Sequence, residues 1–143
     1  MQIDWQANRL LSKLNYVVHT DAIKTFIVPT LTDKQKKFVY SSEADVINVV
    51  LFGMTIKEWR NNNPGLAKKG NIRDYTDLLH LVILNNLQNT NAELIENKIN
   101  QSERLIRLNS SAKRQMKVLK DNKNIKELES LKNQVNNAFL ALE

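Results

Sequence analysis

The sequence predicts an all-α protein, folded as a compact bundle of several helices. Apolar residues recur every three or four positions along most of its 143 residues, which is the periodicity of helices with one buried face. Two capping boxes, each a Thr followed three residues later by Gln or Glu, mark helix starts at Thr32 and Thr55. The short β-prone runs at residues 16–19 and 26–28 have no hairpin partner nearby. We therefore expect helices and no sheet.

The N-terminal part of the chain predicts two helices. In the first, residues 3–14, apolar side chains at helical spacing are expected in the core: Trp5, Leu10, Leu11 and Leu14. Thr20 or Asp21 can cap a short second helix, which Pro29 then ends. A tryptophan beside an arginine can also stack on nucleic-acid bases, but this spacing favours a core anchor.

The capping box at Thr32 begins the next helical stretch. Its apolar residues fit one long helix up to Gly53, or two short helices if Ser41 and Ser42 interrupt it. Gly53 stands where a left-handed residue commonly ends a helix.

Residues 52–76, which we call the corner, gather three glycines and a proline between helical patterns. The box at Thr55 begins a short helix carrying Trp59, and Pro64 ends it because proline disfavours a helical residue before it. The corner lacks the G-x-x-x-x-G-K-[ST] pattern and the preceding strand of a P-loop. We expect a bend between helices, with exposed lysines. Its basic residues are candidate contacts to a phosphate backbone: Arg60, Lys68, Lys69 and Arg73.

The second half of the chain predicts two long helices. The first starts near residue 73 or 75, and its segment LLHLVILNNL is apolar nearly all round, so we expect the central buried helix there. Ser102 can cap the second, whose leucines leave the basic side chains on other faces. With a net charge of +6, this basic helix, residues 102–123, is either a solvated face or a contact for nucleic acid or an acidic partner. The candidate contacts are Arg104, Arg107, Lys113, Arg114, Lys117 and Lys120.

A last amphipathic helix is predicted after a weak break at residues 121–124. Its apolar residues nearly form the a/d seam of a coiled coil, which suits contact with another helix or another chain. This assembly seam consists of Ile125, Leu128, Leu131, Val135, Phe139 and Leu142. We therefore divide the chain into a helical domain, residues 1–121, and a possible assembly element, residues 122–143.

Residues able to do chemistry form no recognised motif. The chain has no cysteine, which removes disulfides, thiolate nucleophiles and cysteine-based zinc sites. His80 is expected in the core and His19 at a helix start, and neither belongs to a metal-binding pattern. The serines lack the glycines of a nucleophile elbow. Two charged pairs would need burial to act as acid and base: Glu43 with Asp45, and Arg73 with Asp74. We expect no enzyme activity, no cofactor and no metal.

The sequence also predicts a cytoplasmic location. No apolar run approaches the roughly 18–20 residues that cross a bilayer, and the N-terminus is too polar for a signal peptide. We expect no membrane association.

Several short stretches are distinctive when taken together. They are HTDAI at 19–23, EAD at 43–45, LFGMT at 51–55 with EWR at 58–60, GNIRDY at 70–75, NAELI at 91–95 and RQM at 114–116. Through them, the chain from Ile3 to Leu119 resembles the helical region that follows the KilA-N domain in many phage and prophage proteins.

The resemblance implies a context rather than a mechanism. In such proteins the KilA-N module comes first and is taken to bind DNA, and none of its DNA-contacting residues is carried over here. The chain is then either a trimmed piece of a longer protein or a free-standing copy with another task. We expect a non-enzymatic viral domain that docks a host or phage protein, or assembles copies of itself, in a bacterial cytoplasm. The alternatives are direct nucleic-acid binding through the basic helix, and inhibition of a bacterial defence ribonucleoprotein such as a CRISPR effector.

Overall fold

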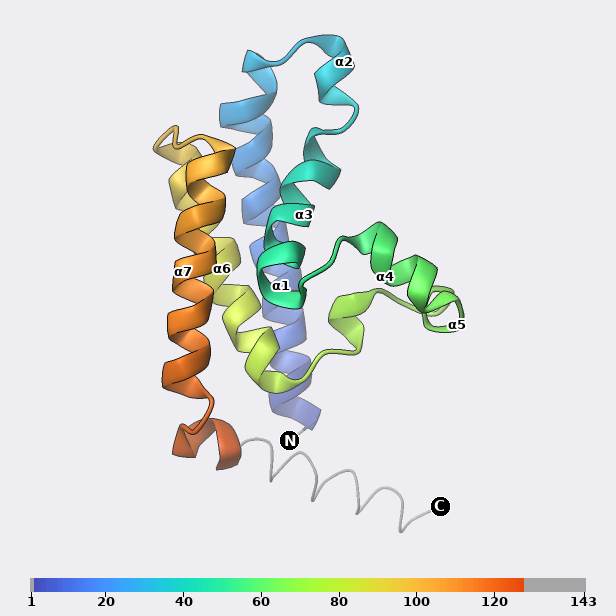
Figure 1. Ribbon diagram of the computed structural model, residues 1–143, viewed down its shortest axis with the longest axis vertical. Coiled ribbons are helices and arrows are strands. Elements are labelled where there is room, and N and C mark those ends of the chain that lie inside the picture. Colours follow the sequence, from blue (N-terminus) through green and yellow to red (C-terminus); the bar gives the residue numbers. More distant parts are fainter. Residues whose placement is uncertain (1, 128–143) are drawn as a thin grey trace.

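The computed structural model describes residues 2–127 and is all-α over that range, as predicted (Figure 1). Four long helices make up the bundle: α1 (Gln2–Ala22), α3 (Val39–Phe52), α6 (Leu78–Glu96) and α7 (Gln101–Leu119). The shorter helices are α2 (Asp33–Lys36), α4 (Ile56–Asn62) and α5 (Pro64–Ala67). A π turn (Ile23–Ile27) and two 3-10 turns (Val28–Thr30 and Ile72–Asp74) complete the chain up to α7.

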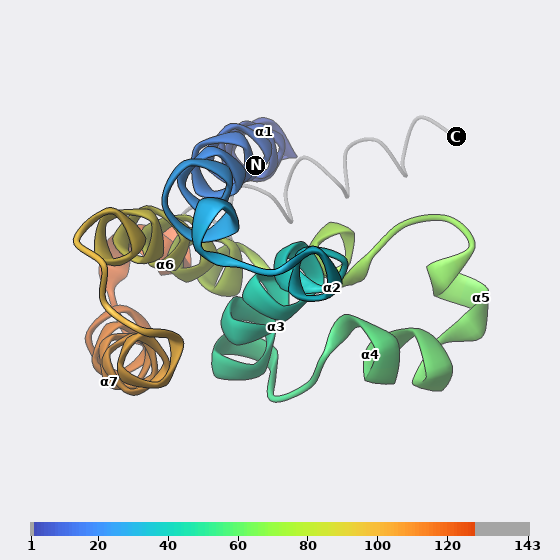
Figure 2. The same cartoon turned by 90° about the horizontal axis from the view of Figure 1, so that it is seen from above.

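Helix α6 is the central helix of the bundle. Seen from above, it lies between α1 and α7, and α3 packs beside α6 and α7 (Figure 2). Leu81, Ile83, Leu84 and Leu87 are fully buried there and join residues of α3 and α7 in the main hydrophobic core. Burying one such side chain stabilises the fold by about 1.5–3 kcal/mol. The prediction of a central buried helix in this segment is confirmed.

Helix α1 differs from the prediction in both length and orientation. It is one continuous helix from Gln2 to Ala22, without a cap at Thr20 or Asp21, and it continues into the π turn. The prediction that its leucines are buried was wrong, because Leu10, Leu11 and Leu14 are exposed.

The buried side of α1 is polar because α6 presents amides to it. We call these hydrogen-bonded residues, among which Ser12 takes part through its backbone carbonyl, the polar ladder: Asn8, Ser12, Asn15 and His19 of α1, with Asn85, Gln88 and Asn91 of α6. The outermost pairs, Asn8 with Asn85 and His19 with Asn91, follow the same order along both helices, so α1 and α6 run parallel. A buried amide or imidazole is tolerated when each polar atom finds a hydrogen-bond partner. Leucine side chains on this side of α1 would have offered no such partner to the amides of α6.

Most helix ends follow the local sequence. The capping boxes at Thr32 and Thr55 both form, and Gly53 ends α3 with a left-handed φ of 73°. The stretch after Thr32 contains two helices, but the break lies at Lys37 and Phe38 rather than at the two serines. Helix α7 begins two residues earlier than predicted, because Asn100, not Ser102, is its N-cap: Asn100 Oδ1 accepts from the N–H of Glu103 at 2.9 Å.

The corner projects from the bundle as an arm formed by α4 and α5 (Figures 1 and 2). Trp59 is buried and stacks on Tyr75, with 6.0 Å between the ring centroids. The hydroxyl of Tyr75 donates to the carbonyl of Leu66 at 3.2 Å. These contacts hold the arm against the start of α6, and the predicted bend between helices is observed.

No single helix in the described range is both long and apolar enough to cross a membrane, although α3 and α4 together, with a bend of 63° between them, meet those two criteria.

Candidate functional site

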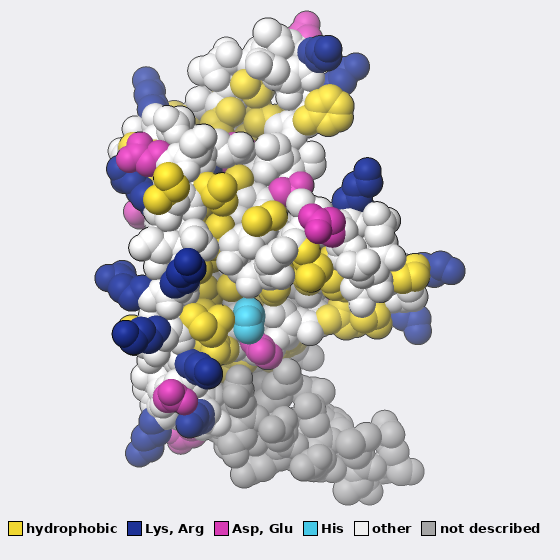
Figure 3. Space-filling view, viewed as in Figure 1, with side chains coloured by type: hydrophobic (Ala, Val, Ile, Leu, Met, Phe, Trp, Pro, Cys, Tyr) yellow, Lys and Arg dark blue, Asp and Glu magenta, His cyan; other side chains and the backbone are white. Residues whose placement is uncertain are grey.

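The cations predicted on the basic helix fall into two groups. Five of them are exposed along the outer side of α7, where Lys and Arg side chains line the edge of the molecule (Figure 3). They are Arg107, Lys113, Arg114, Lys117 and Lys120. Arg107 pairs with Glu103 one turn earlier, with 2.7 Å between nitrogen and oxygen, and an exposed pair of this kind contributes little to stability.

Arg104 does not belong to this surface, and its assignment as a nucleic-acid contact was wrong. Its side chain is buried, and its guanidinium makes a bidentate ion pair with Glu43 of α3, at 2.6 Å and 2.8 Å. The reason is its helical phase, because Arg104 lies one turn before Leu108 and so shares the face of α7 that packs on the core.

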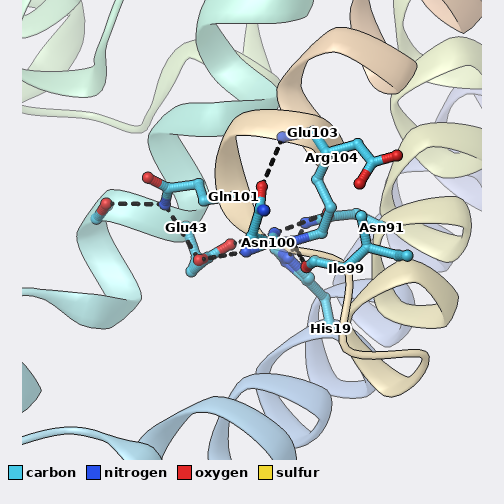
Figure 4. Close-up of polar contacts among 9 residues, drawn as sticks. His19, Glu43, Asn91, Ile99, Asn100, Gln101, Glu103 and Arg104 are labelled. Atoms are coloured by element: carbon cyan, nitrogen blue, oxygen red, sulfur yellow. Dashed lines mark hydrogen bonds and ion pairs between the residues drawn. The ribbon is translucent and has the colours of Figure 1, made fainter.

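The ion pair is the centre of a buried polar network that joins four helices (Figure 4). Arg104 also donates from Nη1 to Asn91 Oδ1 at 3.0 Å and from Nε to the carbonyl of Ile99 at 3.0 Å. Gln101 donates to Glu43 at 3.1 Å. Every charged atom of the pair therefore has a partner, which is the condition for a buried ion pair to be tolerated.

His19 completes this network from α1, and the structure fixes its protonation. Its Nε2 lies 2.7 Å from Asn91 Nδ2. Because Asn91 Oδ1 already accepts from Arg104, the Asn91 amide donates, so Nε2 is an acceptor and the proton is on Nδ1. Burial, together with the positive charges of Arg73 and Arg104, lowers the pKa of His19 to about 4, against the opposing charge of Glu43. His19 is a neutral core histidine, not a residue at a helix start.

His80 takes the role that had been expected of His19. It lies half-buried in the first turn of α6, whose N-cap is Asp77. Its Nδ1 is 2.7 Å from Asp77 Oδ1, and this hydrogen bond raises the pKa of His80. The ring stacks on Phe52, with centroids 6.2 Å apart. Asp77 therefore caps α6 and holds the His80 ring through the same carboxylate.

Neither of the two candidate acid–base pairs forms in the structure: Glu43 does not bond to Asp45, and Arg73 does not bond to Asp74. Glu43 bonds to Arg104 and Gln101, whereas Asp45 accepts from the backbone N–H of Ile56 and so supports the start of α4. Asp74 bonds to Arg9 of α1 at 2.9 Å. Within residues 5–127, no three His, Asp or Glu side chains are placed to hold a metal ion.

The structure also separates the predicted cations of the corner. Arg60, Lys68 and Lys69 are exposed on the arm. Arg73 was a candidate contact to a phosphate backbone as well, but only 8% of it is exposed, because it lies in the 3-10 turn with its guanidinium against Tyr16 of α1. Arg60 and Arg73 line one cavity of 270 Å³ that Lys68 and Lys69 do not reach.

A larger groove of 810 Å³ lies above the polar network. Its walls come from the π turn, α2, α3 and the connection from α6 to α7, and include Phe26, Val39 and Ile95. Glu43 and Arg104 line the same groove, but each is already paired with the other. The groove can therefore offer apolar contact, and its two charges are not free to bind a ligand.

One exposed surface was not anticipated from the sequence. Five apolar side chains of α1, which we call the α1 apolar face, point away from the core: Leu10, Leu11, Leu14, Val17 and Val18. In Figure 2, α1 lies at the edge of the described bundle, with α6 and α3 on its inner side. The sequence contained the relevant pattern, because Ser12, Asn15 and His19 occupy the opposite helical phase.

The predicted assembly seam is mostly outside the described residues. Ile125 is buried within the chain. The rest of the seam, Leu128, Leu131, Val135, Phe139 and Leu142, falls in residues 128–143. The division of the chain into a helical domain, residues 1–121, and an assembly element, residues 122–143, stays a prediction.

No family model, curated protein or solved structure matches this sequence. The resemblance to the region after a KilA-N domain stays a prediction based on the short stretches that carry it.

Proposed function

We propose that this chain is a non-enzymatic interaction domain that associates with a second copy, or with an apolar helix of another protein, through the α1 apolar face. The observation that carries the proposal is the exposure of this face. Leu14 is 57% exposed and Val17 is 64% exposed, and their neighbours Leu10 and Val18 are similarly open.

Helical spacing makes these residues one continuous surface. Leu10, Leu14 and Val17 follow each other at intervals of four and three, so they lie along one side of α1. A row of large apolar side chains on one side of a helix is typical of a helix that packs against another helix. Scattered exposed apolar residues need no explanation, whereas a contiguous patch marks a contact surface.

The proposal fits the resemblance to phage and prophage proteins, in which this region accompanies a DNA-binding module. An assembling helical domain would bring several such modules together, or would fix a free-standing copy to a host protein, including a component of a defence complex. In each case the contact would be made by the same surface, the α1 apolar face.

Sedimentation velocity of the full chain over a wide concentration range tests the proposal. We expect self-association that Leu14→Glu and Val17→Glu weaken, because each buries a charge in the interface. Val118→Glu on α7 is the matched control, since Val118 is equally exposed but lies outside the α1 apolar face. A chain that stays monomeric throughout excludes self-assembly. Photo-crosslinking from position 14 in host lysate then tests docking, and absence of any crosslink ends the proposal.

A second candidate function is nucleic-acid binding by the outer side of α7. Lys113, Lys117 and Lys120 are spaced by four and three residues, so they form one exposed row, and no carboxylate within residues 5–127 pairs with them. Binding would weaken with salt by a log–log slope of about 0.9 per neutralised phosphate on duplex DNA. Charge reversal at Lys113 and Lys117 that leaves DNA affinity unchanged would exclude it.

A further inference from the structure

Arg73 is a buried guanidinium without an anionic partner. Only 8% of the residue is exposed, yet none of the ion pairs among the described residues includes it. Arg104 is equally buried but has Glu43. Since burial of an unpaired charge is costly, the position of Arg73 calls for an explanation other than fold stability.

The contacts of Arg73 with the other described residues orient its guanidinium group but leave two of its nitrogens without a hydrogen-bond acceptor. With the Gln88 amide oriented to satisfy both its atoms, Oε1 accepts from Arg73 Nη1 at 2.7 Å and Nε2 donates to the carbonyl of Ser12 at 3.2 Å. The guanidinium carbon also lies 5.8 Å from the centre of the Tyr16 ring, a cation–π distance. Nε and Nη2 have no acceptor in the described part of the chain.

The cavity beside Arg73 is lined by further cations. It has a volume of 270 Å³, lies between α1, α3, α4 and the turn before α6, and includes Arg9, Lys13 and Arg60 in its lining. Lys13 and Arg60 are exposed, so they form the mouth of the cavity, while Arg73 lies at its inner end. The carboxylate of Asp74 neutralises Arg9 alone, which leaves a strong excess of positive charge.

The electrostatics of Arg73 agree with this geometry. Burial, and next the neighbouring charge of Arg9, lower the pKa of Arg73 to about 10, against the opposing effect of Tyr16. The group still carries its proton at neutral pH, so the cavity holds a charged guanidinium that is both desolvated and repelled. Asn48 lines the same cavity, and its buried Oδ1 has no hydrogen-bond donor within the described structure.

We propose that this cavity binds the phosphate group of a small molecule, with the guanidinium of Arg73 as the inner anchor and Arg60 and Lys13 closing on it from the mouth. A planar guanidinium with free N–H groups matches two oxygens of a phosphate at once. A group with two negative charges balances the cluster better than a single carboxylate. The space fits one phosphate with a small substituent, and Asn48 and Asn71 supply neutral polar contacts for that substituent.

Isothermal titration of the full chain at fixed ionic strength tests the proposal, with inorganic phosphate and glycerol 3-phosphate as probes and chloride as the reference anion. We expect saturable binding of at least one phosphate probe. A preference for glycerol 3-phosphate assigns the natural ligand as a phosphomonoester, and equal binding assigns free phosphate. No saturable binding of either probe at millimolar concentration overturns the proposal.

Two variants locate the binding. Arg73→Gln and Arg60→Gln should each weaken it by about tenfold or more, the usual loss of one charge-assisted hydrogen bond. Lys57→Gln on the same helix as Arg60 should leave it unchanged, because Lys57 does not line the cavity. Arg60 is exposed, so its variant reports on binding even if Arg73→Gln does not fold. Equal affinity in Arg60→Gln and Lys57→Gln would contradict the site, as would tighter, Arg60-dependent binding of a DNA oligonucleotide with none of phosphate.

Discussion

Replacing Arg104 by Met tests whether this residue stabilises the core, as the structure indicates, rather than contacting nucleic acid, as the sequence predicts. The side chains of Arg104 and Glu43 are 3% and 4% exposed, and two hydrogen bonds join them. Removing the cation leaves the carboxylate of Glu43 buried with only Gln101 as a donor. We expect the free energy of unfolding to fall by about 3–5 kcal/mol, the cost of breaking a buried pair.

Urea unfolding followed by circular dichroism measures this loss, and a domain of this size should lose about 10 °C or more in melting temperature. Two further variants make the result specific. Arg107→Met removes an exposed ion pair on the same helix and should change stability by at most about 0.5–1 kcal/mol. The double variant Glu43→Leu/Arg104→Met removes both charges and should be more stable than Arg104→Met alone. Equal losses for Arg104→Met and Arg107→Met would refute the buried-pair interpretation.

Three other substitutions probe the core, the helix end and the buried histidine. Leu84→Ala, at a fully buried position of the main core, should cost about 2–5 kcal/mol in denaturant unfolding. Gly53→Ala should cost about 1 kcal/mol in the same measurement, because φ is 73° there and a Cβ strains that conformation, although nothing else lies within reach of it. The pKa of His19 is lowered from 6.5 to about 4, so only the unfolded chain takes up this proton as the pH falls through that window. Stability should fall there by up to about 3 kcal/mol. His19→Gln should lose that part of the pH dependence, and an unchanged profile would argue against it.

The sequence predicts the helices well where a local cause acts. The capping boxes at Thr32 and Thr55, the left-handed end at Gly53 and the apolar segment of α6 all depend on neighbours within a few residues, and all four are observed. Local patterns fail where a distant partner decides the outcome. α1 buries polar side chains because α6, about seventy residues later, presents Asn85 to it.

The candidate site residues show the same limit. Exposure of Arg107 follows from its place opposite the leucines of α7, whereas the burial of Arg104 depends on Glu43, sixty-one residues away. Its phase with Leu108 was the available indication. Nothing local distinguishes Arg73 from Arg60, because the cavity that joins them is formed by α1 and α3 only after folding.

The polar ladder has a consequence for how the domain can vary. An interface of leucines alone specifies the register of two helices weakly, whereas buried polar residues specify one register. Here such a slip would set Asn91 against the wrong neighbour and strand several amides in a dry interface at once. The ladder therefore permits only one register between α1 and α6. Sequence changes at this interface should occur in pairs, with Asn15 and Asn85 replaced together rather than one by one.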